Sequence, residues 1–142
     1  MKKKFIDYFM RVAQETASLS SAVRLKVGCV IVRDNRILSI GYNGTPTGWD
    51  NCCEENDKTK PEVIHAESNA LTKLCQSNES SKGAVAFVTH APCMDCAKLL
   101  YQAGIAEVIY KEEYRSRSGI EFLHKAGVLT WQKIGLPVNH AT

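Results

Sequence analysis

The sequence lacks any apolar run close to the roughly 18 residues that a membrane-spanning helix needs. It also lacks an excess of one charge, because 18 basic and 15 acidic residues leave a formal net charge of +3. That surplus is too small for a protein that coats nucleic acid, although it suits a small anionic ligand. Hydrophobic residues make up 44% and charged residues 23%, which excludes a disordered, collagen-like or low-complexity chain.

The 142 residues predict one domain over residues 1–142, with a loose tail at 135–142. The start of the chain is basic, but Asp7, Arg11 and Glu15 interrupt any apolar segment, so we expect a cytoplasmic protein that is not exported. In a reducing cytoplasm the six cysteines are not expected to form disulfides. Cys52 and Cys53 are expected to be buried or to pack in a loop, rather than to bind a second zinc.

The pattern of apolar residues predicts a mixed α/β fold. Two strands around a polar Asp-Asn turn predict an antiparallel hairpin, and a long polar loop, residues 43–62, follows it. Beyond this loop helices and strands alternate, which favours parallel pairing. Helices are expected over residues 5–19, 66–76, 93–103 and 118–126, and strands over 27–32, 37–42, 84–88, 106–110 and 128–134.

Two short segments carry residue types that bind metal. Residues 92–96 read Pro-Cys-Met-Asp-Cys, and the start of a helix there would place both thiols on one face and favour their thiolate forms. Residues 65–67 read His-Ala-Glu. Zinc prefers four nitrogen or sulfur ligands, so His65, Cys93 and Cys96 would leave its fourth position to water, which is the catalytic pattern.

The charges of these residues support a catalytic zinc. Two thiolates and a neutral imidazole cancel the charge of Zn²⁺, and Glu67 could accept a proton from the water if it faces inward. Two alternatives stay open: a redox pair of cysteines, or half of a structural zinc site with a further ligand. The candidates for that ligand are Cys29, Cys52, Cys53, Cys75, His90 and His124.

The pattern H-x-E followed by P-C-x-x-C is the signature of zinc-dependent nucleobase deaminases. Over residues 5–130 the chain resembles the deoxycytidylate (dCMP) deaminases of the cytidine deaminase-like superfamily. The resemblance includes Lys26–Val32 and, most specifically, the loop Gly41–Gly48, which reads Gly-Tyr-Asn-Gly-Thr-Pro-Thr-Gly. It implies a three-layer α/β/α fold, in which a mixed five-stranded sheet with an N-terminal antiparallel hairpin carries helices on both faces.

The resemblance also implies an activity, the hydrolytic deamination of dCMP to dUMP for thymidylate synthesis. His65, Cys93 and Cys96 would hold Zn²⁺, and Glu67 would be the proton shuttle. An activated water would attack C4 of the pyrimidine while Glu67 protonates N3, and ammonia would then leave.

The family resemblance also implies contacts with the substrate. Asn43 would bind the sugar and base region, and main-chain groups of Ala66 and Ala91 would hydrogen-bond the base. A 5′-phosphate needs cations or N–H donors, and Arg115 is a stronger candidate than Arg117, although either could be a solvated surface charge. The proposed phosphate contacts are Ser21, Arg24, Tyr114 and Arg115.

The family resemblance extends to regulation and assembly. An effector site, where dCTP activates and dTTP inhibits with Mg²⁺ on the phosphates, would involve Arg33, Asn35, Asn43 and Gly44, unless the glycine loop merely shapes a turn. A homo-oligomer, often a hexamer, is expected, with neither a nucleic-acid nor a membrane partner. The open alternatives are deamination of dCTP or of both nucleotides, of free cytidine or of tRNA adenosine, and a non-catalytic zinc- or nucleotide-sensing module.

Overall fold

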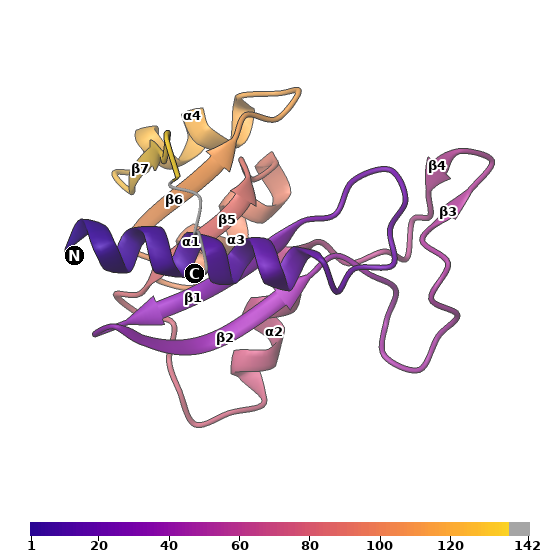
Figure 1. Ribbon diagram of the computed structural model, residues 1–142, viewed down its shortest axis with the longest axis horizontal. Coiled ribbons are helices and arrows are strands. Elements are labelled where there is room, and N and C mark those ends of the chain that lie inside the picture. Colours follow the sequence, from indigo (N-terminus) through magenta and orange to yellow (C-terminus); the bar gives the residue numbers. More distant parts are fainter. Residues whose placement is uncertain (137–142) are drawn as a thin grey trace, which may run out of the picture.

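The computed structural model describes residues 1–136, and its centre is a five-stranded sheet in the order β2-β1-β5-β6-β7. The sheet contains β1 (Gly28–Arg33), β2 (Arg36–Tyr42), β5 (Val85–His90), β6 (Glu107–Glu112) and β7 (Leu129–Gln132). The helices are α1 (Lys3–Ala17), α2 (Ala66–Cys75), α3 (Met94–Gln102) and α4 (Ser118–Lys125). A small hairpin of β3 (Glu54–Glu55) and β4 (Lys58–Thr59) projects away from the sheet (Figure 1).

The sheet is mixed, as predicted. β1 pairs antiparallel with β2 and with β5, whereas β5, β6 and β7 are parallel. The turn between β1 and β2 holds Asp34 and Asn35 at φ values of 53° and 57°. Asp and Asn tolerate this left-handed conformation, which suits the twist of a two-residue hairpin. The predicted N-terminal hairpin is therefore confirmed.

Helices cover both faces of the sheet, which explains why β1 is an unbroken apolar run. Val30 and Val32 pack in one cluster with Met10 of α1. Cys29 and Ile31 point to the opposite face, where they share a core with residues of α2, α3 and α4. Alternate side chains of a strand point to opposite faces, so a strand that is buried on both sides has no polar positions. Figure 1 shows α1 and α2 on either side of the β1–β2 pair.

Several boundaries differ from the prediction. The first helix ends at Ala17, two residues early, and the last strand shortens to Leu129–Gln132. The long polar loop is not wholly irregular, because Asn56 and Asp57 adopt positive φ and close the β3–β4 hairpin. Of the predicted tail, residues 137–142 lie outside the described part. Among residues 1–136 no helix is both long and apolar enough to cross a bilayer.

Candidate active site

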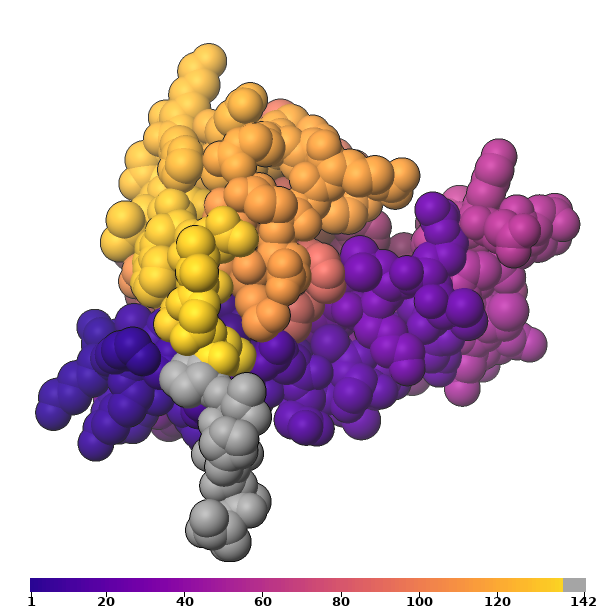
Figure 2. Space-filling model, turned by 45° about the horizontal axis from the view of Figure 1, so that its top comes forward, coloured from indigo at the N-terminus to yellow at the C-terminus, as the bar shows by residue number. Residues whose placement is uncertain are grey.

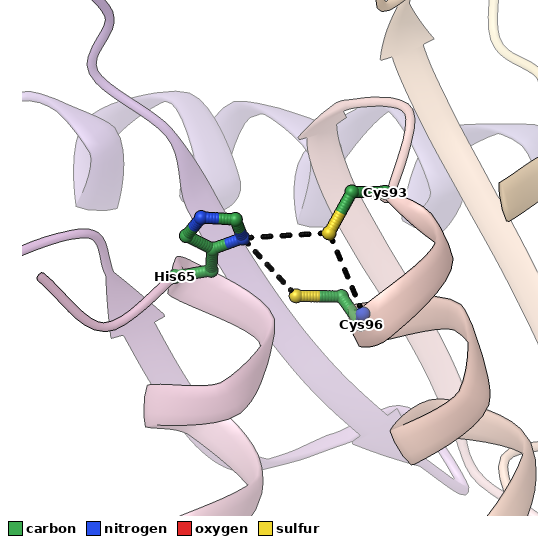
Figure 3. Close-up of side chains that lie close together, drawn as sticks. All are labelled: His65, Cys93 and Cys96. Atoms are coloured by element: carbon green, nitrogen blue, oxygen red, sulfur yellow. Dashed lines mark hydrogen bonds between the residues drawn. The ribbon is translucent and has the colours of Figure 1, made fainter. Parts of the chain in front are cut away.

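The first turns of α2 and α3 meet and bring three metal-binding side chains together. His65 is the N-cap residue of α2, and Cys93 is the N-cap residue of α3. His65 Nδ1 lies 3.5 Å from Cys93 Sγ and 3.4 Å from Cys96 Sγ. The backbone N–H of Cys96 donates to Cys93 Sγ at 3.5 Å (Figure 3).

The spacing of these atoms fits a zinc ion. All three ligand atoms lie within 4.8 Å of one another. With zinc–sulfur bonds of about 2.3 Å and zinc–nitrogen bonds of about 2.0 Å, tetrahedral ligand atoms lie roughly 3.5 to 3.8 Å apart. The two measured separations are close to that range. The predicted His65, Cys93 and Cys96 set is therefore brought together, with donor types that zinc prefers.

The two thiols have opposite electrostatic environments in the absence of a metal. Hydrogen bonds from the Cys96 thiol and from His65 lower the pKa of Cys93 to about 4. The same hydrogen bond to Cys93, together with burial, raises the pKa of Cys96. The contact with Cys93 raises the pKa of His65. One thiolate is thus already stable, and a divalent cation would favour ionisation of the second.

Glu67 is buried at the second position of α2, beside this cluster. Burial raises the pKa of its carboxyl to about 7, because the apolar surroundings disfavour the charged form. A carboxyl that titrates near neutrality can both take up and release a proton at working pH. Glu67 and His65 line the same pocket, so the structure shows the inward orientation that proton transfer by Glu67 requires and that the sequence left open.

The pocket in front of the cluster contains most of the predicted base contacts. Asn43 lies on its wall and braces the neighbouring segment: Val27 N–H donates to Asn43 Oδ1 and Asn43 Nδ2 donates to the carbonyl of Leu25, both at 2.8 Å. The full lining consists of Leu25, Val27, Asn43, Thr59, Val63, His65, Ala66, Glu67, His90, Ala91, Cys93 and Tyr114. We call it the base pocket.

A second, basic hollow adjoins the base pocket. Arg24 and Arg115 both line it. Glu113 also lies there, but the guanidinium of Arg117 donates to both of its carboxylate oxygens, at 2.8 and 2.9 Å. That pairing compensates the negative charge of Glu113. The hollow is therefore suited to an anion. Figure 2 shows the orange segment after β6 on one side of the surface and the purple residues of the N-terminal half on the other.

Comparison with known proteins agrees with this geometry. The sequence model of the cytidine and deoxycytidylate deaminase zinc-binding region matches residues 3–112. The chain belongs to this deaminase family. The resemblance stated from its motifs is thus confirmed, and so is the predicted three-layer fold.

Individual relatives of the deaminase family cover most of this chain. ComE operon protein 2 of Bacillus subtilis is 38% identical, over 89% of this chain and 69% of that protein. Deoxycytidylate deaminase of Saccharomyces cerevisiae is 34% identical over 93% of this chain, but this chain spans only 46% of its length. The dCMP deaminase of cyanophage S-TIM5, in complex with dCMP and dUMP, has 43% identity and a TM-score of 0.92, covering 94% of this chain and 99% of that one.

Two predicted site groups are not assembled as expected. Ser21 lines neither the base pocket nor the basic hollow. The four predicted effector residues are divided between the two ends of the β1–β2 hairpin, because Arg33 and Asn35 lie at its turn and Asn43 and Gly44 follow its other end. Five residues of β1 separate these ends by about 16 Å. Within one copy of this deaminase the four residues do not form a single site.

Arg33 has a different role in the structure. Its guanidinium donates to Glu79 Oε2 at 3.3 Å and to the backbone carbonyl of Ser80. Arg36, across the turn, donates to the other oxygen of Glu79 at 2.6 Å. Arg33 and Arg36 thus bind the β1–β2 hairpin to the segment that follows α2.

Sequence reasoning missed several pocket residues. Thr59 comes from the small β4 strand in the expected loop, and Leu25 and Val27 precede β1. His90 was considered only as a zinc ligand, yet it lies on the wall of the pocket and outside the metal cluster. Its position directly before Ala91 and the Pro-Cys pair was the available signal. Cys53 is buried as expected, whereas Cys52 is exposed.

Main-chain contacts fix the position of α2. A Cβ atom on Gly41 of β2 would collide with the carbonyl oxygen of Ala66 and with the backbone of Ala70. Ser39 strengthens this approach, because its hydroxyl donates to the carbonyl of Ala70 at 2.7 Å. The start of α2, which carries His65 and Glu67, is therefore placed by a close approach of strand and helix backbones.

Proposed function

We propose that this protein catalyses the hydrolytic deamination of dCMP to dUMP with release of ammonia. The observation that best supports this activity is the buried Glu67 beside the cluster of His65, Cys93 and Cys96, in a pocket that opens to a basic hollow. The nucleotides seen in the cyanophage S-TIM5 dCMP deaminase support the substrate class.

His65, Cys93 and Cys96 are the proposed ligands of zinc. When bound, Zn²⁺ would supply Lewis-acid chemistry that makes water a nucleophile at neutral pH. His65 and Cys93 line the base pocket together with Glu67, so a zinc ion held by these ligands would be accessible from that pocket.

Glu67 moves the protons in this proposal. Its carboxylate accepts a proton from the attacking water and delivers it to N3 of the pyrimidine. The proton of the hydroxyl group formed at C4 then passes through Glu67 to the amine at the same carbon, which departs as ammonia and leaves the C4 carbonyl of dUMP. The pKa of about 7 suits both steps, because neither the protonated nor the ionised form is strongly favoured.

The main chain offers complementary groups to cytosine. Ala91 N–H already donates to the carbonyl of Glu112 at 2.8 Å, which leaves the carbonyl of Ala91 as the acceptor for the 4-amino group. Ala66 is the first residue of α2, where backbone N–H groups have no partner within the helix. We therefore assign Ala66 N–H to the O2 carbonyl, with Asn43 beside the sugar.

Arg24 and Arg115 are the proposed phosphate contacts. Both line the basic hollow, and the Arg115 guanidinium lies 5.8 Å from the centre of the Tyr114 ring, a cation–π distance. Glu54 helps to place Arg24, because its Oε2 atom accepts the backbone N–H of Arg24 at 3.2 Å.

The proposal includes finer expectations. The interrupted apolar pattern at the start of the chain supports a cytoplasmic location. Family resemblance alone supports the others, the first of which is that the enzyme would supply dUMP for thymidylate synthesis. It would be a homohexamer. dCTP would activate it and dTTP would inhibit it, with Mg²⁺ on their phosphates, at a site that does not contain Arg33 and Asn43 of the same chain.

The direct test is turnover by the purified, zinc-loaded protein. We expect dCMP to be converted to dUMP and ammonia, with deoxycytidine a much poorer substrate and dCTP run in parallel. A higher kcat/KM for dCTP than for dCMP would favour the dCTP alternative. No turnover of any of the three, with zinc bound and after addition of dCTP and Mg²⁺, would contradict the proposal and favour a sensing module.

A further inference from the structure

His90 lies in the neck that joins the base pocket to the basic hollow. The residues that line both cavities are Leu25, Thr59, His90 and Tyr114. A nucleotide with its base beside Glu67 and its phosphate beside Arg24 and Arg115 must pass this neck. His90 is the last residue of β5, a central strand of the sheet, so its backbone is firmly placed.

Hydrogen bonds fix the tautomer of the His90 ring. Thr89 is buried, and within residues 1–136 its hydroxyl has two partners. It accepts the backbone N–H of Gly28 at 3.1 Å and lies 3.2 Å from His90 Nδ1. A buried hydroxyl proton needs an acceptor, and His90 Nδ1 is the acceptor that residues 1–136 offer it, so we assign the hydroxyl proton to this bond and Nδ1 as the unprotonated nitrogen. The ring proton is then on Nε2, which is left as a donor on a residue that lines both cavities.

The charges around His90 favour an anion, since the nearby carboxylate of Glu112 is paired with Lys111 at 2.7 Å. Arg24 and Arg115 line the same hollow, and Arg117 holds the carboxylate of Glu113 through two hydrogen bonds. Burial lowers the pKa of His90, which favours the neutral ring and the tautomer that Thr89 selects. The arginines supply positive charge, and a neutral Nε2–H of His90 would add a hydrogen bond with a preferred direction.

We propose that His90 is a specificity residue that donates a hydrogen bond from Nε2–H to the 5′-phosphate of the nucleotide. It thereby helps the enzyme to distinguish a nucleoside monophosphate from the free nucleoside. This inference rests on the proposed function, since it assigns a contact to the same substrate.

Two conservative substitutions test the contributions of the two ring nitrogens of His90 one at a time. In His90→Gln the side-chain amide lies near the place of Nε2 and keeps the donor. In His90→Asn the shorter amide lies near the place of Nδ1, so Thr89 keeps a partner while the donor to phosphate is lost. His124→Asn is the matched control, because His124 contacts the carbonyl of Thr130 and lines neither cavity.

The measurement is kcat/KM for dCMP and for deoxycytidine with each variant. We expect His90→Asn to lower kcat/KM for dCMP about 10-fold, a typical loss for a hydrogen bond to a charged group, and to change the value for deoxycytidine less than 2-fold. His90→Gln should recover most of the loss, and His124→Asn should change neither value. An equal fall for both substrates, or no fall for dCMP, would overturn the inference.

A binding measurement keeps this test separate from the proposed function. If the wild type does not turn over dCMP, the proposed function fails, and calorimetric binding of dUMP and deoxyuridine still tests His90. Weaker binding of dUMP alone to His90→Asn supports the contact, and an equal change for both ligands contradicts it. Long-range ¹H–¹⁵N spectra of the imidazole ring should show Nε2 protonated, and protonated Nδ1 with bare Nε2 would also contradict it.

Discussion

The metal cluster and the basic hollow are built in different ways. The cluster consists of a few residues at the starts of α2 and α3, with ligand atoms within 4.8 Å and Glu67 buried beside them. The hollow is lined by residues that are distant in sequence, at the ends of β4 and β5 and in the loops around residues 24 and 115, and its two arginines are exposed residues of these loops. Chemistry that needs fixed geometry is therefore placed on helix ends, and recognition of a diffuse charge is left to loops.

Removal of the metal should produce the largest effect and tests the cluster as a whole. Treatment with a chelator should reduce dCMP turnover to background, because His65, Cys93 and Cys96 alone cannot activate water. Restoring Zn²⁺ should restore activity, whereas Mg²⁺ should not. Turnover and zinc content are measured on the same sample, and an active zinc-free sample would exclude a catalytic role for the metal.

Glu67→Gln should have the next largest effect. The substitution keeps the volume of the side chain but removes its ability to accept a proton, so kcat should fall about 10³-fold. Zinc content should be unchanged, since Glu67 is outside the ligand cluster. Comparable kcat values for the variant and the wild type would assign proton transfer to another group.

Arg115→Ala tests the other half of the comparison. Loss of one charged contact to phosphate should raise KM for dCMP about 10- to 30-fold with little change in kcat. Lys98→Ala removes an exposed cation on α3, which lines neither cavity, and should change neither constant. A fall confined to kcat would place Arg115 in the chemical step instead of phosphate binding.

The pH dependence of the free energy of unfolding should reveal the buried carboxyl of Glu67. Burial raises the pKa of Glu67 from 4.5 to about 7 in the metal-free protein, so its contribution to folding is fully present below pH 4.5 and is lost as pH rises through 7. Between pH 5 and 8 the metal-free wild type should therefore lose more stability than metal-free Glu67→Gln. Urea unfolding at both pH values measures this difference, and equal losses would contradict the raised pKa.

Arg33→Ala should have the smallest effect. Its ion pair with Glu79 is partly exposed, so its loss should lower the free energy of unfolding by about 1 kcal/mol or less. The kcat/KM for dCMP should be unchanged, because Arg33 lies at the far end of the hairpin from the base pocket. A large fall in kcat/KM would show that this end of the hairpin communicates with the site.

The same contrast explains what the sequence could predict. His65, Glu67, Cys93 and Cys96 occur in short motifs, and each motif is positioned by its own helix start, so local spacing is enough to find them. The mixed sheet was predictable because β1 and β5 are apolar runs of strand length. The walls of the pocket were not, since Thr59 and Leu25 reach it only through the path of loops, for which spacing in sequence carries no information.

The grouping of the four effector residues within one chain was not predictable for the same reason. Proximity in sequence grouped Arg33 with Asn43, but a β-hairpin places the residues near its turn far from those at its open end. His90 shows the converse, because the tautomer we infer for it depends on the hydroxyl of Thr89. The bond that this hydroxyl accepts from Gly28 N–H depends on the register of β1 against β5.

The close approach at Gly41 bears on how this sequence can change over evolutionary time. The distance from β2 to the first turn of α2 is set by main-chain atoms, which are common to all amino acids. Apolar residues around the contact can be exchanged without altering that distance, as long as the glycine itself stays. Sequences that differ widely in their cores could thus keep the Glu67 carboxyl in the same position.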